Sequence, residues 1–173
     1  MGVRLAGGLL MVIAGALAGN AKAVRYQYRL EDLRGLLTAI ALVRVHVSNG
    51  SLPLGKAMEY CGSTVAGRVG FLLSRIGSSI EQCGGDPLSV IWQEHKEIAR
   101  RSTALTDDDL SVLDRVFSVI GVGPAEYEVR HLNLAEQLLL AQERDAFAKL
   151  STYPRLWRYL GTIGGAVCAI LLA

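Results

Sequence analysis

The sequence predicts an all-α protein in which a bundle of about six helices lies between two apolar terminal helices. Residues 5–21 and 159–173 carry no charged side chain, whereas charges are spread through the middle of the chain. Within that middle, apolar residues recur at intervals of three and four, which is the period of a helix with one buried face. We therefore expect three parts: an N-terminal transmembrane helix at 1–23, a helical domain at 24–153 and a C-terminal transmembrane helix at 154–173.

Both apolar ends are short against the roughly 20 residues that span a bilayer core. Arg4 and Lys22 flank the first, and their long side chains can reach the headgroups. Trp157 and Tyr159 begin the second and are residue types that favour the membrane interface. An alternative for the first segment is a signal peptide, because Ala21-Lys22-Ala23 resembles an A-x-A cleavage site. The lysine in that triplet and the helical pattern that follows favour a retained helix.

Each apolar end carries a pair of glycines four residues apart. Gly15 and Gly19 form one pair, and Gly161 and Gly165 form the other. This small-residue spacing lets two membrane helices approach closely, so the four glycines are candidate helix-packing positions. The alternative is that glycine is simply common in membrane helices of this composition.

Basic residues predict the orientation of the chain in the membrane. They gather on the inner side of each apolar end: Lys22, Arg25, Arg29 and Arg34 after the first, and Lys149, Arg155 and Arg158 before the second. The positive-inside rule then places the middle domain in the cytoplasm and both termini across the membrane, in contact with lipid.

Composition excludes some classes of partner. The formal net charge of +2 is too small to indicate a nucleic-acid-binding protein. Cys61, Cys83 and Cys168 lack metal-ligand spacing and are odd in number, so free thiols in a reducing compartment are expected.

The first three helices follow from their apolar faces and their breaks. The first continues from the apolar N-terminus and stops at Ser48-Asn49-Gly50. Ser51 is the predicted cap of the second helix, with Pro53 in its first turn. The third is predicted at about 64–82, before Gly84-Gly85. The expected buried faces are Leu30, Leu33, Leu37, Ile40 and Val43, then Leu54, Ala57, Met58 and Cys61, then Val65, Val69, Leu72, Leu73, Ile76 and Ile80.

The last three helices are marked by stronger start signals. Asp86-Pro87 begins the fourth, and Thr106 caps the fifth, whose first turn holds Asp107-Asp108-Asp109 at the positive end of the helix dipole. Residues 121–124 form a tight break, and the sixth helix runs from there into the tail, with a bend predicted near Pro154. The expected buried faces are Leu88, Ile91, Trp92, His95 and Ile98, then Leu110, Leu113, Val116, Phe117 and Ile120, then Val129, Leu132, Leu139 and Ala146.

No arrangement of residues in the sequence indicates catalysis. The three histidines are far apart: His46, His95 and His131. His95 is predicted to be a structural histidine, and Cys61, Cys83 and His95 lack the spacing of a zinc site. Capping accounts for Asp107-Asp108-Asp109. We expect no enzyme activity, no cofactor and no metal.

Several segments together resemble the stage III sporulation protein AB family of endospore-forming bacteria. They are the turn over residues 43–57, a lone central tryptophan, the segment LTDDDLSVLDRVFSVIG over 105–121, and the tail YPRLWRYLGTIGG. The matching positions are Pro53, Leu54, Ala57, Trp92, Asp109, Leu113, Gly121, Leu160, Gly161 and Gly164. His46, Val47 and Leu52 depart from the first motif. After Gly121 the family has a Ser-Asp pair and then a Gln, where this chain has Gly123-Pro124-Ala125 and Val129.

The resemblance implies a helical cytoplasmic domain similar to those of the platform proteins of type II secretion and type IV pilus machines. It implies a place in the channel complex between mother cell and forespore, in the mother-cell-derived membrane around the forespore. The implied partners are a secretion-type ATPase, stage III sporulation protein AA, and other membrane components of the channel. The alternatives are a membrane-anchored adaptor of another envelope complex and, more distantly, a soluble enzyme with a cleaved leader.

Overall fold

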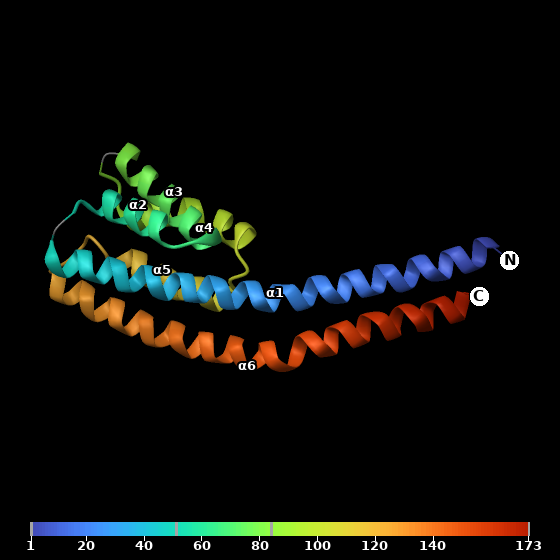
Figure 1. Ribbon diagram of the computed structural model, residues 1–173. Helices are drawn as coiled ribbons and strands as arrows, with labels where there is room; N and C mark the ends of the chain where they lie inside the picture. Colours follow the sequence, from blue (N-terminus) through green and yellow to red (C-terminus); the bar gives the residue numbers. More distant parts are fainter. Residues whose placement is uncertain (1, 51, 84, 173) are drawn as a thin grey trace. The chain divides into compact units, whose positions relative to one another are not determined.

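The computed structural model describes the backbone of residues 2–50, 52–83 and 85–172, and the side chains of residues 14, 17, 19–50, 52–83 and 85–150. Over these residues the chain forms six α-helices and no strand, which confirms the all-helical prediction (Figure 1). The helices are α1 (Gly2–Asn49), α2 (Leu54–Thr64), α3 (Gly67–Cys83), α4 (Leu88–Ser102), α5 (Asp107–Val119) and α6 (Ala125–Leu172). They belong to two compact units, one of residues 29–144 and one of residues 1–28 with 145–173.

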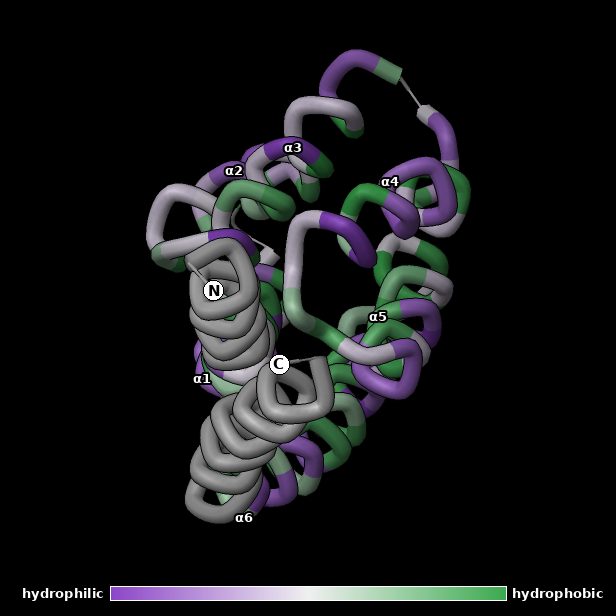
Figure 2. The backbone as a smooth tube through the Cα atoms, turned by 90° about the vertical axis from the view of Figure 1, so that its right-hand side faces the viewer, coloured by the Kyte–Doolittle hydropathy of each residue, from purple (hydrophilic) through white to green (hydrophobic). Residues whose placement is uncertain are grey.

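The unit of residues 29–144 is a helical bundle around one apolar core. Every one of the six helices contributes buried apolar side chains to it, and Figure 2 shows hydrophobic segments along the helices of this unit. Among the largest side chains with under 2 % exposure are Leu33, Met58, Ile76, Trp92, Leu110, Leu132 and Leu139. Since full burial of one such side chain contributes about 1.5–3 kcal/mol, this core is the main source of the bundle's stability.

Most of the predicted buried faces are confirmed, and α5 agrees at all five positions. The face of α1 is wider than predicted, because Leu36 and Ala39 are also buried. Five residues expected inside are half-buried: Leu37, Leu54, Ile80, Ile98 and Val129.

Glycine ends α1 as the sequence predicts. The Gly50 backbone is left-handed, with φ +57°, and its N–H donates to the His46 carbonyl at 3.0 Å. Left-handed backbone at this position is the common way to terminate a helix, and glycine adopts it without a Cβ penalty.

The starts of α2 and α3 differ from the predictions. Pro53 is the N-cap residue of α2 and not part of its first turn, and α2 has no side-chain cap hydrogen bond. Ser51 lies outside the described residues. The third helix begins at Gly67 and not near Thr64, because α2 continues through Thr64. Gly67, whose backbone is left-handed with φ +83°, is the first residue of α3.

Helices α2 and α3 form a close hairpin whose contact is made by glycines. A Cβ added to Gly62 would lie 2.5 Å from the Ser74 backbone nitrogen, and one added to Gly77 would lie 2.9 Å from the Gly55 oxygen. The two backbones therefore pack against each other directly (Figures 1 and 2). The predicted helix faces did not include these glycines.

The predicted starts of α5 and α6 are confirmed. Thr106 caps α5 in a capping box: its side chain accepts from the Asp109 N–H, and the Asp109 carboxylate accepts from the Thr106 N–H at 2.8 Å. Helix α6 starts at Ala125, directly after the break at residues 121–124.

The other unit consists of residues 1–28 and 145–173, the first part of α1 and the last part of α6. Helix α6 continues past Pro154 to Leu172, so the sixth helix does enter the tail. Among the residues whose side chains are described, no helix is both long enough and apolar enough to cross a membrane. The predicted transmembrane segments, 1–23 and 154–173, lie largely outside that part of the chain, as does the predicted bend near Pro154.

Candidate functional site

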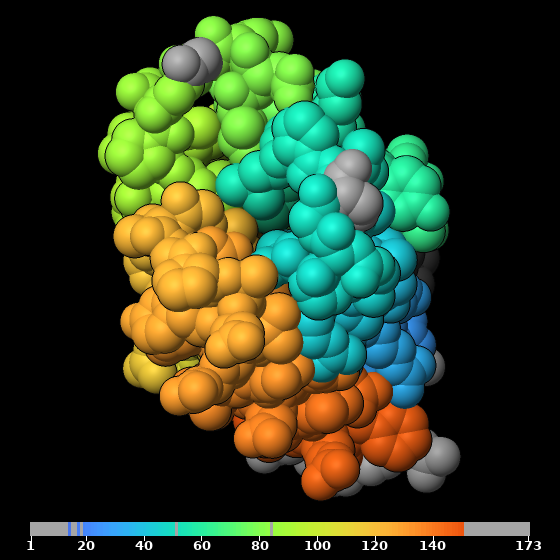
Figure 3. Space-filling model, turned by 90° about the vertical axis from the view of Figure 1, so that its left-hand side faces the viewer, coloured from blue at the N-terminus to red at the C-terminus, as the bar shows by residue number. Residues whose placement is uncertain are grey.

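A pocket of about 190 Å³ opens at the end of the bundle where α1 stops, α2 begins and the α5–α6 loop turns. Figure 3 shows this face, with the segment after α1 beside the start of α6. We call it the end pocket. Its lining residues are Val43, His46, Val47, Gly50, Leu52, Leu54, Ala57, Ile120, Gly121, Gly123, Ala125 and Glu128.

The end pocket joins two motifs that are far apart in the sequence. Leu54 and Ala57 belong to the first segment that resembles the sporulation family, and Gly121 ends the third. The left-handed Gly121 backbone, with φ +83°, lets the loop turn beside Leu54, whose Cδ2 would lie 3.7 Å from a Cβ at that position. Pro53 precedes α2 at the same place. These matching positions therefore shape one surface feature.

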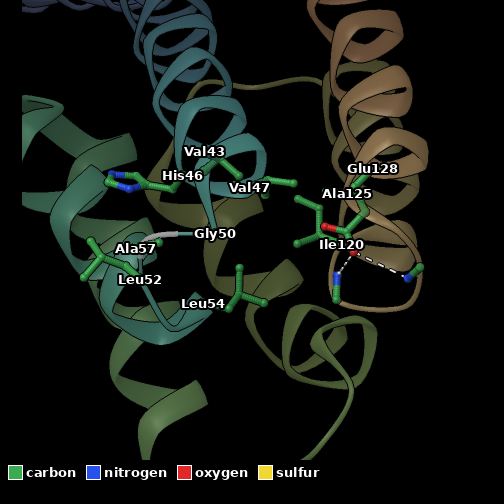
Figure 4. Close-up of a pocket in the computed structure, with 12 residues that line it drawn as sticks. Val43, His46, Val47, Gly50, Leu52, Leu54, Ala57, Ile120, Ala125 and Glu128 are labelled. Carbon is green, nitrogen blue, oxygen red and sulfur yellow. Dashed lines mark hydrogen bonds between the residues drawn. The ribbon is translucent and has the colours of Figure 1, made fainter.

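Glu128 holds the α5–α6 loop in place. It is 7 % exposed, and its Oε1 accepts hydrogen bonds from the backbone N–H groups of Gly121, at 2.9 Å, and Gly123, at 3.4 Å (Figure 4). The carboxylate also sits in the first turn of α6, where the helix dipole favours negative charge. The sequence prediction missed this residue, although an acidic residue in the first turn after a glycine-rich loop is a recognisable signal.

The end pocket is apolar on most of its wall. His46 and Glu128 are its titratable lining residues, and the Glu128 carboxylate already accepts a hydrogen bond from the Gly121 N–H of the loop. The His46 ring points toward α2, away from Ile120, and packs edge-on against Tyr60 with ring centroids 5.3 Å apart (Figure 4). Its Nδ1 is buried without a hydrogen-bond partner. Such a pocket suits an apolar side chain from another molecule, since one acidic group used for structure offers little for acid–base chemistry.

Trp92 joins α4 to α5. It is 1 % exposed, its Nε1 donates to Asp114 Oδ1 at 2.7 Å, and its ring lies 4.6 Å from that of Phe117. Lys96 Nζ donates to the other Asp114 oxygen, also at 2.7 Å. Burial raises the pKa of Asp114, but the hydrogen bonds from Lys96 and Trp92 outweigh burial and hold the pKa below its ordinary value. The matched tryptophan therefore has a structural role.

Asp109 joins α5 to α1. Its side chain is fully buried and accepts two hydrogen bonds from Arg29, each at 2.9 Å, in addition to the capping bond from Thr106. Burial raises its pKa, yet the bonds from Arg29 and Thr106 outweigh burial and lower the pKa below the ordinary value. The sequence predicted the helix-start role of this residue and missed its partner on α1.

A second buried carboxylate joins α1 to two other segments. Asp32 is 3 % exposed. Its carboxylate accepts one hydrogen bond from Arg68 of α3 at 3.1 Å and another from the Ala104 N–H at 2.7 Å. Burial raises its pKa, and the bonds from Ala104 and Arg68 offset burial only in part. No sequence pattern had singled out Asp32.

His95 is a structural histidine, as predicted. Its Nδ1 lies 2.9 Å from the Ile91 carbonyl and its Nε2 lies 3.2 Å from the Ser79 hydroxyl, so both ring nitrogens have partners. Cys61 is fully buried, and burial raises the pKa of its thiol to about 11, which keeps it unreactive. In the described part of the chain, no three ligand-type side chains are grouped to hold a metal ion.

The remaining predicted site residues lie at the apolar ends. Gly19 is buried. The surroundings of the others, Gly15, Leu160, Gly161, Gly164 and Gly165, lie outside the described side chains.

Known proteins share both the sequence pattern and the fold. The family model for stage III sporulation protein AB matches residues 4–173. The chain belongs to the stage III sporulation protein AB family. A member from Bacillus subtilis (strain 168), called stage III sporulation protein AB, is 23% identical over 170 residues, which cover 98% of this chain and 99% of that protein.

The fold of the bundle also recurs in a solved structure. A stage III sporulation protein AB has a TM-score of 0.66 and 22% sequence identity, with 71% of this chain and 96% of that chain covered. Family membership supports a role in sporulation and confirms the resemblance identified from the sequence.

Proposed function

We propose that the protein is a non-enzymatic platform component of the mother cell–forespore channel complex. In this proposal residues 1–23 and 154–173 are transmembrane helices in the mother-cell-derived membrane around the forespore. Residues 24–153 face the mother-cell cytoplasm. This domain binds a secretion-type ATPase similar to stage III sporulation protein AA. It couples the motion of the ATPase to membrane components of the channel.

The observation that carries the proposal is the continuity of two helices. Helix α1 runs unbroken from Gly2 to Asn49, and α6 runs unbroken from Ala125 to Leu172. Each therefore connects an apolar end of the sequence to the bundle without an intervening loop. A helix transmits displacement along its axis, whereas a flexible linker would absorb it.

Polar contacts between α1 and α6 inside the bundle support the same role. Arg34 Nε lies 2.9 Å from Glu143 Oε1, and Arg44 forms an ion pair with Glu136 and donates to Asn133 at 2.7 Å. The Arg34 side chain is exposed and the Arg44–Glu136 pair is half-buried, so each ion pair contributes only about 1 kcal/mol or less. Their value here is that they fix the register of the two helices that lead to the apolar ends.

Within this proposal the end pocket is the contact for an apolar side chain of the ATPase. The pocket is mostly apolar and partly open, and three of its lining residues match the family: Leu54, Ala57 and Gly121. Leu52 at its rim is 42 % exposed, so it can be changed without opening the core.

The test of the ATPase contact is co-purification from sporulating cells. Leu52→Asp should remove most of the co-purifying ATPase, because a carboxylate at the rim disfavours entry of an apolar side chain. Phe71→Asp on α3 is the matched control, since Phe71 is 62 % exposed and does not line the pocket. Equal recovery with both variants would refute the pocket contact. Recovery of other envelope proteins without any ATPase would favour the adaptor alternative.

The test of topology is thiol accessibility in intact cells. A cysteine introduced near Gly85, in the loop between α3 and α4, should be protected from an impermeant reagent because that loop would be cytoplasmic. Ready labelling would contradict both the orientation and the ATPase coupling.

A further inference from the structure

Helix α6 carries a second stripe of mostly apolar residues, in which Tyr127, Leu134 and Ala141 are exposed and His131 and Leu138 are half-buried. Tyr127, His131, Leu134, Leu138 and Ala141 follow one another at alternating intervals of four and three residues. Tyr127 is 47 % exposed and Leu134 is 49 % exposed, although Leu132 and Leu139 of the same helix are buried. We call these five residues the outer stripe. It extends for about 20 Å along a helix at the edge of the bundle (Figure 1).

The spacing of the outer stripe is the one by which helices pack on helices. Apolar residues at alternating intervals of three and four form the seam of a coiled coil, where each side chain enters a hole on the partner helix. The rings of Tyr127 and His131 lie 4.5 Å apart, so the first turn of the stripe is already packed as a unit. A second helix is therefore the occupant that this spacing fits.

Two arginines beside the outer stripe add charge to one flank. Arg130, Gln137 and Arg144 follow each other at intervals of seven, so they lie in one row next to the stripe. Both arginines are exposed. Within the described residues neither makes a hydrogen bond or an ion pair, unlike Arg34 and Arg44 of α1. A partner with carboxylates opposite this row would be complementary in charge.

We propose that the outer stripe is the docking surface for an amphipathic helix of a partner protein, with apolar residues at the same alternating spacing and carboxylates along one flank. The inference rests on the proposed platform function, because a platform holds several partners at once. It assigns one of them to the outer stripe, whose five residues do not line the end pocket.

A second copy of this chain fits the outer stripe poorly. An antiparallel pair centred on Gln137 would place Arg130 of one copy opposite Arg144 of the other, so like charges would meet along the flank that carries the arginine row. A parallel pair would set the arginine row against the positions of Glu128 and Ala135. Those two residues are 7 % and 4 % exposed and belong to the bundle of their own chain.

The experiment is photo-crosslinking of the full chain in a sporulating host, where it replaces the host's own family member. Benzoylphenylalanine placed at Leu134 is activated by light, and the crosslinked peptides are sequenced by mass spectrometry. The expected product contains a segment of a different protein with the stated apolar spacing and acidic flank. The same probe at Phe71, on an exposed face of α3, should not give this product.

Charge reversal makes the test specific for the arginine row. Arg130→Glu with Arg144→Glu should lower the yield of the crosslink at least tenfold, and lysines at the partner's acidic positions should restore it. Arg75→Glu is the control, because Arg75 is also exposed but lies on α3. A yield that is unchanged by the double reversal, or equally reduced by the control, would overturn the proposal. So would crosslinks only to a second copy or only to lipid, or no crosslink.

Sporulation counts separate this inference from the proposed function. If loss of the whole chain blocks sporulation and Leu134→Glu does not, the outer stripe has no docking role while the platform proposal stands. If loss of the whole chain has no effect on sporulation, the platform proposal itself fails.

Discussion

Asp109 gives the sharpest test of how the bundle is held together. Asp109→Asn keeps the size of the side chain but removes its charge and turns one acceptor atom into a donor. The substitution takes the carboxylate partner away from Arg29, which donates two hydrogen bonds of 2.9 Å to the fully buried side chain of Asp109. Breaking a buried ion pair by removing one partner costs about 3–5 kcal/mol. Since the Arg29 side chain keeps 15% exposure, water can reach part of it, and we expect a loss of about 3 kcal/mol.

The measurement is urea unfolding of residues 24–153, the fragment that the sequence predicts to be soluble and helical. The parent, Asp109→Asn and the control Asp108→Asn are compared at pH 7. Asp108 lies in the same first turn but is exposed, so only the helix-dipole term of under about 1 kcal/mol is expected from the control. A loss of under about 1 kcal/mol for Asp109→Asn would refute the assigned role of the pair.

The difference in unfolding free energy between the parent and Asp109→Asn should depend on pH if the charge of Asp109 causes it. The pKa of Asp109 is lower in the folded protein than its ordinary value of 3.8. A carboxylate with a lowered folded pKa contributes its full stability above the unfolded pKa and loses it as the pH falls through the folded pKa. The difference between the parent and Asp109→Asn should therefore be constant from neutral pH to about 5 and shrink below about 4. A difference that persists at about pH 2 would show that packing, and not charge, causes the loss.

Three further predictions test packing. Phe117→Ala should destabilise the fragment by about 3–5 kcal/mol in urea unfolding, because the ring is 3% exposed, and a loss of under about 1 kcal/mol would contradict its burial. Gly62→Val should cost about 3 kcal/mol by overpacking, since its Cβ would lie 2.5 Å from the Ser74 nitrogen, and a neutral result would disprove the direct α2–α3 contact. Gly161→Leu with Gly165→Leu should leave membrane insertion and folding normal but abolish complex assembly or spore development, and normal sporulation would show that these glycines are only compositional.

The sequence predicts most of the helices because their signals are local. Thr106 with Asp109 is a capping box within four residues, and Gly50 and Gly121 are turn residues at the ends of apolar periodic segments. Such signals depend on neighbours in the chain, so they can be recognised without the fold. The buried face of α5 was correct for the same reason, since its period of three and four is undisturbed.

The α2–α3 boundary and the ion pairs between helices could not be predicted in this way. Val65 fits the apolar period of the third helix, so periodicity extended that helix backward past Gly67, whose left-handed backbone starts it. Asp32 and Arg29 pair with residues that are 36 and 80 positions away along the chain. No spacing rule links residues at such distances, and only packing of α1 against the other helices brings them together.

The end pocket shows why an altered motif need not mean a lost structure. After Gly121 this chain departs from the family pattern, with Gly123-Pro124-Ala125 and Val129 in place of the Ser-Asp pair and the Gln. The loop is nevertheless held, because the carboxylate of Glu128 accepts from the N–H groups of Gly121 and Gly123. One buried acidic group thus binds two backbone donors of the loop. The same bonds fix the loop beside Leu54, so the wall of the end pocket depends on a residue outside the matching motifs.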